Sequence, residues 1–281
     1  MAVEELKKTL VLGHRNPDTD SICSAICYAG FKHQLTGENY EPCRAGNVNP
    51  ETQYVLDYFK LKAPRLVENV KTQVKDIEIR KTKGVSRGIS LKNAWGLMQE
   101  NNVVTLPCVT EEGLLEGVIT IGDITKSYMN LYDSSIISKA CTKYANILDT
   151  LEGSMVVGDS EAYFDRGKVL IAAANPDLME NYIEKHDLVI LGNRYESQLC
   201  AIEMEAGCII VCEGAGVSLT IRKLAQERGC AVITTPYDTY TTARLINQSM
   251  PISYFMTKEN IIEFSEEDYL DDIREIMASK R

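Results

Sequence analysis

A histidine and two aspartates directly follow a short apolar run near the start of the chain. The run spans residues 9–13, and His14, Asp18 and Asp20 stand within the next seven residues. The run predicts a buried β-strand, and the residues from Ser21 to Ala29 predict a helix. The three polar side chains therefore fall on a strand-to-helix turn. Because open α/β sheets place their sites at the carboxyl ends of strands, this stretch favours an α/β fold with a site at that edge.

The spacing of these three side chains indicates a metal site. Imidazole nitrogen and carboxylate oxygen suit Mn²⁺, Co²⁺, Zn²⁺ or Mg²⁺ better than metals that prefer thiolates. Each residue alone has a plainer interpretation. Asp18 after Pro17 is typical of a helix N-cap, and His14 could be an ordinary hydrogen-bonded histidine. The combined spacing at a strand end favours the metal.

Composition limits the classes of protein to which the chain can belong. Its 281 residues allow about two to three domains. The net charge of −10 argues against nucleic acid and anionic membranes as partners. We expect neither a membrane-spanning helix, since no apolar run is long enough, nor a signal peptide. Nine scattered cysteines without a C-x-x-C pair indicate free thiols in the cytoplasm. A zinc site at Cys208 and Cys212 is the weaker alternative.

The stretch GHRNPDTDSICSAICYA at residues 13–29 resembles the first motif of the DHH superfamily, and specifically of the family II inorganic pyrophosphatases. The resemblance implies that His14, Asp18 and Asp20 bind Mn²⁺ or Co²⁺, with Mg²⁺ as a further alternative. Residues 40–52 also fit the family, in which a second strand and a loop lead to a helix.

The family's remaining metal ligands come from later motifs that this sequence does not show. The other two histidines, His33 and His186, stand in contexts that do not match those motifs. With only three ligands, we expect little or no hydrolysis by the chain itself.

The pattern changes after Leu66 to helix, strand, turn, strand and helix, predicted at residues 91–100, 103–109, 111–113, 115–120 and 124–130. This unit resembles a CBS domain. Gly117-Val118-Ile119-Thr120-Ile121-Gly122-Asp123 matches the G-x-x-T-x-x-D pattern of nucleotide-binding CBS repeats. The resemblance implies an adenine-nucleotide site at Thr120 and Asp123, with Lys83 and Arg87 from the preceding loop.

The residue types in this motif fit the implied chemistry. The Thr120 hydroxyl and backbone N–H groups at a helix N-terminus favour a phosphate, and the Asp123 carboxylate can accept hydrogen bonds from a ribose diol. The alternative is a helix cap at Asp123 with a buried Thr120.

Residues 131–150 predict a helical connector, and an α/β pattern begins at Gly153. Its predicted strands are 154–157, 168–172, 188–191, 208–211 and 231–234, and its predicted helices are 177–184, 195–205 and 218–228. This alternation indicates a mainly parallel sheet. Residues 192–198, 212–216 and 236–244 resemble a DRTGG domain, although its name-giving motif is not kept literally. The resemblance implies a spacing and dimerisation role.

The residues after Ser249 resemble the opening half of a second CBS repeat. The spacing from Ser265 to Asp268 predicts the start of a helix that ends at Ser279. A CBS repeat then continues with two strands and a helix, so we expect the chain to be truncated at its C-terminus relative to that family.

Together these segments predict an α/β protein with four parts: a parallel-sheet DHH portion, a CBS domain, an α/β DRTGG domain and the start of a second CBS repeat. The predicted boundaries are 1–64, 65–130, 131–249 and 250–281. This order resembles the regulated subclass of family II inorganic pyrophosphatases. It implies hydrolysis of pyrophosphate to two orthophosphates in a homodimer, under control by AMP, ADP, ATP or a diadenosine polyphosphate.

Two other functions stay open from the sequence. The chain could be a non-catalytic module for adenine-nucleotide sensing and dimerisation. It could also be a DHH-type phosphoesterase acting on nucleotides or oligonucleotides, although the acidic composition and the CBS unit count against that class.

Overall fold

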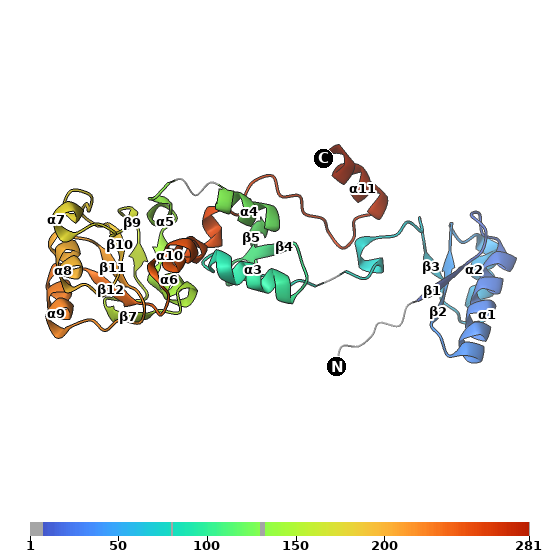
Figure 1. Ribbon diagram of the computed structural model, residues 1–281. Helices are drawn as coiled ribbons and strands as arrows, with labels where there is room; N and C mark the ends of the chain where they lie inside the picture. The colour runs from blue at the N-terminus through green and yellow to red at the C-terminus, as the bar shows by residue number, and fades with distance from the viewer. Residues whose placement is uncertain (1–7, 80, 130–132, 281) are drawn as a thin grey trace. The chain divides into compact units, whose positions relative to one another are not determined.

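The computed structural model of the chain describes residues 8–79, 81–129 and 133–280 (Figure 1). They form two compact units. One combines the residues up to Ile79 with those from Glu263 on, and the other runs from Arg80 to Ile262. Among the described residues, no helix has the length and apolar character needed to cross a membrane.

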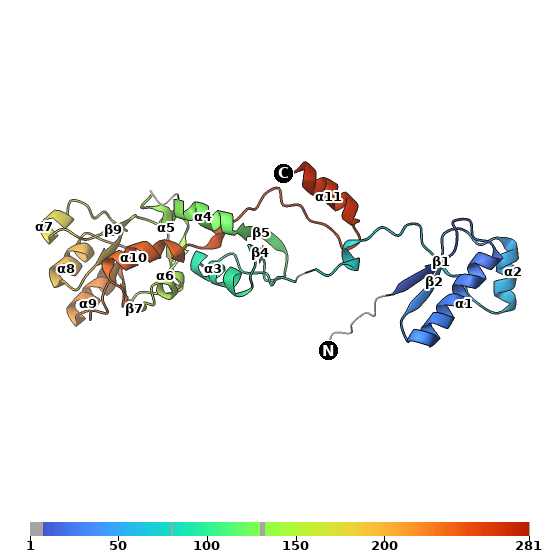
Figure 2. The same ribbon diagram turned by 45° about the vertical axis from the view of Figure 1, so that its right-hand side comes forward.

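The first unit contains a parallel three-stranded sheet in the order β1-β2-β3, with bounds Thr9–Leu12, Tyr40–Arg44 and Arg65–Leu66. Helices α1 (Thr19–Thr36) and α2 (Pro50–Tyr58) make the two crossovers. Both crossovers move the same way across the sheet, so right-handed connections place both helices on one face. Figure 1 shows this common side, and Figure 2 shows α1 along it.

Local signals set the ends of these helices. Asp18 and Asn49 accept backbone hydrogen bonds at the starts of α1 and α2. Gly37, with φ 73°, ends α1 in the left-handed conformation that glycine adopts without strain.

The first unit also joins two segments that are distant in sequence. Leu270 N donates to Thr72 O, Val74 N to Asp268 O and Lys75 N to Glu266 O, each at 3.0 Å. These bonds join the short 3₁₀ turn η1 (Val74–Asp76) to the residues just before helix α11 (Leu270–Ser279).

The predicted helix start at Ser265 is wrong. The Asp268 carboxylate accepts from Ser265 N at 2.7 Å, so these residues form a separate turn. The helix begins only at Leu270, with Tyr269 in the cap position.

The second unit begins with a hairpin between two helices, in the order α3 (Leu91–Glu100), β4 (Thr105–Val109), β5 (Leu115–Thr120) and α4 (Ile121–Met129). Ser90 caps α3 by accepting from Asn93 N at 3.1 Å. The chain reverses between the strands at Gly113, whose φ of 84° suits glycine.

A second segment returns to the start of α3. Leu91 N donates to Met250 O, Ile252 N to Ile89 O and Ser253 N to Arg87 O, at 2.9 to 3.0 Å. The donors and acceptors of these three bonds have the same separations in sequence as those of the three bonds before α11. The starts of α3 and α11 are therefore held by the same hydrogen-bond pattern.

A five-stranded sheet follows in the order β7-β12-β11-β10-β9. Four neighbouring strands are parallel and β7 is antiparallel to β12, as a mainly parallel sheet predicts. The strands are β7 (Ser154–Val157), β9 (Val169–Ile171), β10 (Leu188–Leu191), β11 (Cys208–Val211) and β12 (Ala231–Thr234). The helices are α7 (Pro176–Met179), α8 (Tyr195–Glu203), α9 (Leu219–Arg228) and α10 (Thr239–Leu245).

The predicted helix at 177–184 is much shorter in the structure. It ends at Met179. The buried Asp187 carboxylate accepts hydrogen bonds from Glu184 N and Lys168 N, both at 2.9 Å, and holds the chain in a turn where the helix would continue.

The predicted helical connector also contains a short strand. Helices α5 (Ile136–Lys139) and α6 (Tyr144–Thr150) flank β6 (Thr142–Lys143). β6 pairs with β8 (Tyr163–Phe164), which the sequence did not predict. The 3₁₀ turn η2 (Ile246–Ser249) follows α10.

Alternate residues of the five-stranded sheet pack into two separate apolar cores. Val189 and Ile209 face the core formed with α7, α8 and α9. Ile190 and Ile210 face the other core. This core continues through Ile147 of α6 into the segment from α3 to α4, where it includes Met98, Leu106 and Ile119. The segment from α3 to α4 and the five-stranded sheet therefore share one apolar core.

All nine cysteines are free, as the sequence predicts, and six of them are buried. Burial raises the pKa of the Cys108 thiol to about 11. In the described ranges no three or more histidine, cysteine or acidic side chains come together as a possible metal site, whether at Cys208 and Cys212 or at His14, Asp18 and Asp20.

Replacing Leu151 with alanine tests the shared core. Leu151 follows α6 and is 0 % exposed, so the cavity should lower the free energy of unfolding by about 2–5 kcal/mol. Leu219→Ala is the matched control, because Leu219 is 75 % exposed and should change stability by no more than about 0.5 kcal/mol. Urea unfolding followed by circular dichroism measures both; equal losses would contradict the core assignment.

Candidate functional site

His14 and Asp18 face each other at the carboxyl end of β1. His14 Nε2 lies 3.3 Å from Asp18 Oδ1, and the two side chains are 58 % and 62 % exposed. Asp18 Oδ1 also accepts from Ser21 N at 2.9 Å. That backbone bond is the main cause of the lowered pKa of Asp18, and the charge of His14 adds to it. Asp18 is thus both a helix cap and an exposed oxygen donor beside an imidazole.

Asp20 lies in the first turn of α1, where Ser24 Oγ donates to its carboxylate at 3.3 Å. The structure therefore brings His14 and Asp18 together without placing Asp20 beside them. The imidazole nitrogen and carboxylate oxygen of the first two fit Mn²⁺ or Co²⁺ by ligand type.

Two glycines shape this turn, and the sequence alone did not single them out. A Cβ on Gly13 would lie 1.9 Å from Ser21 Oγ, and one on Gly46 would lie 2.5 Å from Arg15 O. The loop after β2 therefore packs directly on the motif. The only sequence signal for this is the presence of glycine after each strand.

Thr120 and Asp123 bond to each other at the start of α4. Asp123 Oδ2 accepts from Thr120 N at 2.9 Å and from Thr120 Oγ1 at 2.7 Å, and Asp123 N donates back to Thr120 Oγ1 at 3.2 Å. This reciprocal pattern is a capping box at the start of α4. It agrees only in part with the alternative of a helix cap, since Thr120 is half-buried and not buried. The box also fixes both side chains at a helix N-terminus, where backbone N–H groups favour an anion.

The structure places Lys83 and Arg87 differently relative to that motif. Val85 pairs in parallel with Cys108 near the end of β4, while Thr105 at the start of β4 pairs with Thr120. Lys83 precedes Val85 and so lies toward the Thr120 end. Arg87 lies toward the other end, where its Nη1 is 3.2 Å from Glu116 Oε1.

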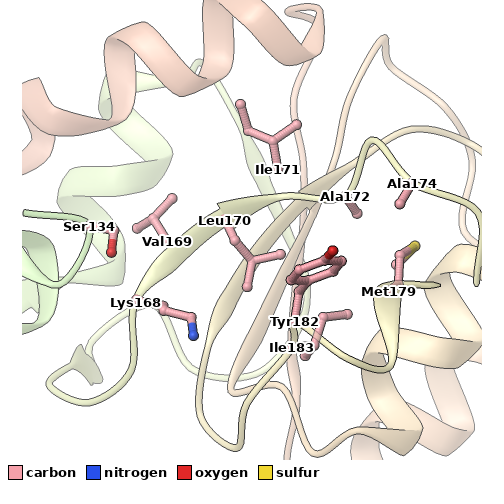
Figure 3. Close-up of a pocket in the computed structure, with 10 residues that line it drawn as sticks. All are labelled: Ser134, Lys168, Val169, Leu170, Ile171, Ala172, Ala174, Met179, Tyr182 and Ile183. Carbon is pink, nitrogen blue, oxygen red and sulfur yellow. The ribbon is translucent and has the colours of Figure 1, made fainter.

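A pocket of about 320 Å³ lies beside the edge strand β9. Figure 3 shows its largely apolar lining, with the Tyr182 ring near Ile183 and with Leu170 and Ile171 on opposite sides of the strand. Its one charged side chain, Lys168, pairs with Glu184 at 3.0 Å. This pocket therefore offers little for catalysis.

Comparison with known proteins identifies two domains, the first of which begins at Val74, within the first unit. Residues 74–130 match the CBS domain and residues 146–249 match the DRTGG domain. The crystal structure of the CBS and DRTGG domains of the regulatory region of Clostridium perfringens pyrophosphatase, complexed with the activator diadenosine tetraphosphate, is similar with a TM-score of 0.71 and 35 % identity. The similarity covers 75 % of this chain and 92 % of that chain.

This chain belongs to a family of proteins that combine a CBS domain with a DRTGG domain. The predicted α/β fold with CBS and DRTGG domains is thereby confirmed. The hairpin between α3 and α4 belongs to the CBS domain, and the five-stranded sheet belongs to the DRTGG domain.

Longer relatives match nearly the whole chain. The cobalt-dependent inorganic pyrophosphatase of Clostridium perfringens is 39 % identical over 96 % of this chain and 49 % of its own length. A probable manganese-dependent inorganic pyrophosphatase of Thermotoga maritima is 29 % identical over 99 % of this chain and 51 % of its own length. The chain thus spans about half the length of these relatives. The manganese-dependent inorganic pyrophosphatase of Bacillus subtilis is 57 % identical over 72 residues.

The capping box predicts a local stability effect. Thr120→Val removes the hydroxyl that both donates to and accepts from Asp123, and should lower the free energy of unfolding by about 1 kcal/mol. Thr125→Val on the same helix should cost no more than about 0.5 kcal/mol, because Thr125 is exposed and its hydroxyl bonds only to Ile121 O. Chemical unfolding compares the two; a larger loss at Thr125 would refute the box.

Proposed function

We propose that this chain is part of a metal-dependent inorganic pyrophosphatase whose activity is regulated by adenine nucleotides. The observation that carries the proposal is the 39 % identity with a cobalt-dependent inorganic pyrophosphatase over 96 % of the chain, which spans both units. The substrate is pyrophosphate and the product is orthophosphate.

In this proposal, His14, Asp18 and Asp20 hold Mn²⁺ or Co²⁺, with Mg²⁺ as the alternative. A bound divalent metal lowers the pKa of water and polarises a phosphoryl oxygen. The residues themselves supply one nitrogen and carboxylate oxygens at the carboxyl end of β1. The bond from Ser21 N fixes the Asp18 carboxylate, and the exposure of His14 and Asp18 leaves room for a large anion.

The regulatory part of the proposal places an adenine nucleotide at the start of α4. Thr120 and the backbone N–H groups there face the phosphate, Asp123 accepts from the ribose, and Lys83 supplies a positive charge from the same end of β4. Arg87 belongs to the predicted site as well, but its ion pair with Glu116 makes it the weakest member. AMP, ADP, ATP and diadenosine polyphosphates all offer the required groups.

A cytoplasmic homodimer completes the proposal. The acidic composition supports a protein without nucleic acid or membrane partners. The free thiols support the cytoplasm. The DRTGG domain is the part that we expect to form the dimer.

A non-catalytic nucleotide-sensing and dimerisation module is the second candidate. One observation favours it: within the described residues, no three acidic, histidine or cysteine side chains converge as a metal site. The two candidates differ in metal binding at His14.

Manganese binding tests the catalytic part. His14→Ala should weaken Mn²⁺ binding by at least about tenfold, because it removes the nitrogen donor. His33→Ala is the matched control, since His33 is an exposed histidine whose Nδ1 lies 2.7 Å from Glu38 O, and it should change the affinity by less than about twofold. Electron paramagnetic resonance measures the concentration of free Mn²⁺ during titration and so gives the Mn²⁺ affinity of wild type, His14→Ala and His33→Ala.

The same samples are assayed for orthophosphate release from pyrophosphate, and we expect little. If wild type binds no Mn²⁺, or if His33→Ala weakens binding as much as His14→Ala, the metal site is refuted. Strong metal-dependent release that His14→Ala abolishes would show that the chain holds a complete active site, contrary to this expectation.

AMP binding tests the regulatory part. Lys83→Ala should weaken AMP binding by about tenfold, as expected for losing one hydrogen bond to a charged group. Arg87→Ala should weaken it by no more than about threefold, because the guanidinium is engaged with Glu116 at the other end of β4. Isothermal titration calorimetry measures both variants against wild type.

A wild-type chain that binds no AMP would refute the nucleotide site. A larger loss in Arg87→Ala than in Lys83→Ala would show that the phosphate lies at the opposite end of the strands.

A further inference from the structure

A pocket of about 590 Å³ lies between the CBS domain and the DRTGG domain, inside the second unit. Tyr128 lines it from α4, and the remaining residues come from α10 and η2: Tyr240, Thr241, Ala243, Arg244, Leu245, Asn247 and Gln248. Tyr128 is eight residues after Thr120, which corresponds to about 12 Å along the helix axis. The pocket and the Thr120–Asp123 motif are therefore at opposite ends of α4.

Two tyrosines and one arginine meet in this pocket. The Arg244 guanidinium lies 5.8 Å from the centroid of the Tyr240 ring, and its Nη1 donates to Tyr240 Oη at 3.2 Å. Burial raises the pKa of Tyr128, while Arg244 and a hydrogen bond with Gln248 oppose the rise. Tyr128 and Tyr240 thus line the same pocket as the guanidinium of Arg244.

The charge of the pocket is positive although the chain is acidic. None of the lining residues is aspartate or glutamate. The ion pairs found among the described residues do not include Arg244. On a chain of net charge −10, a guanidinium without a carboxylate partner beside a hollow of this size favours a small anion.

We propose that this pocket binds a nucleoside monophosphate. The guanidinium of Arg244 matches a phosphate through paired N–H donors. The rings of Tyr128 and Tyr240 offer faces on which a base can stack. The amides of Asn247 and Gln248 can donate to and accept from the base edge. The volume lies in the range that binds small ligands.

Such a ligand would contact both domains at once. Its site joins α4 of the CBS domain to α10 and η2 of the DRTGG domain, above the core that the two domains share. It is a second site, separate from the nucleotide site proposed at Thr120 and Asp123, and it does not depend on that site.

Fluorine NMR of the whole chain labelled with 3-fluorotyrosine tests the proposal with AMP as the probe. The variants Tyr128→Phe and Tyr240→Phe assign the two signals among the fourteen tyrosines. We expect saturable shifts of both signals as AMP is added.

Three variants distinguish AMP binding in this pocket from AMP binding at Thr120 and Asp123. Arg244→Ala should weaken the AMP-dependent shifts by at least about tenfold. Arg228→Ala is the matched control, because Arg228 lies on α9, outside the pocket, and is paired with Glu203 of α8, so the shifts should be unchanged. Asp123→Asn should also leave the shifts unchanged.

Two kinds of result would overturn the proposal. One is that AMP shifts neither signal, or shifts them equally in Arg244→Ala and in wild type. The other is that Asp123→Asn abolishes the shifts, which would mean that the tyrosines report binding at the Thr120 end. A failure of the first nucleotide site would instead appear as unchanged AMP affinity in Lys83→Ala.

Discussion

The apolar core shared by the CBS and DRTGG domains is the constraint on which the second unit depends. Alternate residues of β10 and β11 face this core. Ile147 connects these strand residues to Met98 and Leu106 in the segment from α3 to α4. Because packed interiors transmit strain and resist local deformation, the two domains act as one body. A ligand on either domain therefore acts on a single packed object and not on two modules joined by a linker.

Both candidate motifs use an aspartate in two ways. Asp18 caps α1 and faces His14; Asp123 closes a capping box with Thr120. In each case a backbone N–H holds the carboxylate in place before any ligand arrives. Structural and functional interpretations of these residues are thus compatible, because a side chain that is already ordered loses less conformational entropy when it binds.

Much of the fold follows from local patterns in the sequence. The bounds of α3 and β5 match their predictions, because Ser90 gives a clear cap and β5 lies between the turn at Gly113 and the helix start at Thr120. The turn at His14 and Asp18 was also predictable from the strand before it. These features depend on neighbours within a few residues.

Features that depend on distant partners could not be predicted. The shortening of α7 depends on Asp187, and the separation of Lys83 from Arg87 depends on the pairing of Val85 with Cys108. The pocket beside Tyr128 and Tyr240 exists only because α4 and α10 meet in space. No periodicity within either helix carries that information.

The hydrogen bonds between residues 72–75 and 266–270 bring together, within the first unit, the two stretches of chain that flank the second unit in sequence. The entropy of closing a loop grows only slowly with its length, by about 0.6 kcal/mol for each doubling. The free energy of forming the first unit therefore depends only weakly on the length of the chain between those two points. The chain between those two points can therefore be lengthened or shortened at little entropic cost to the first unit.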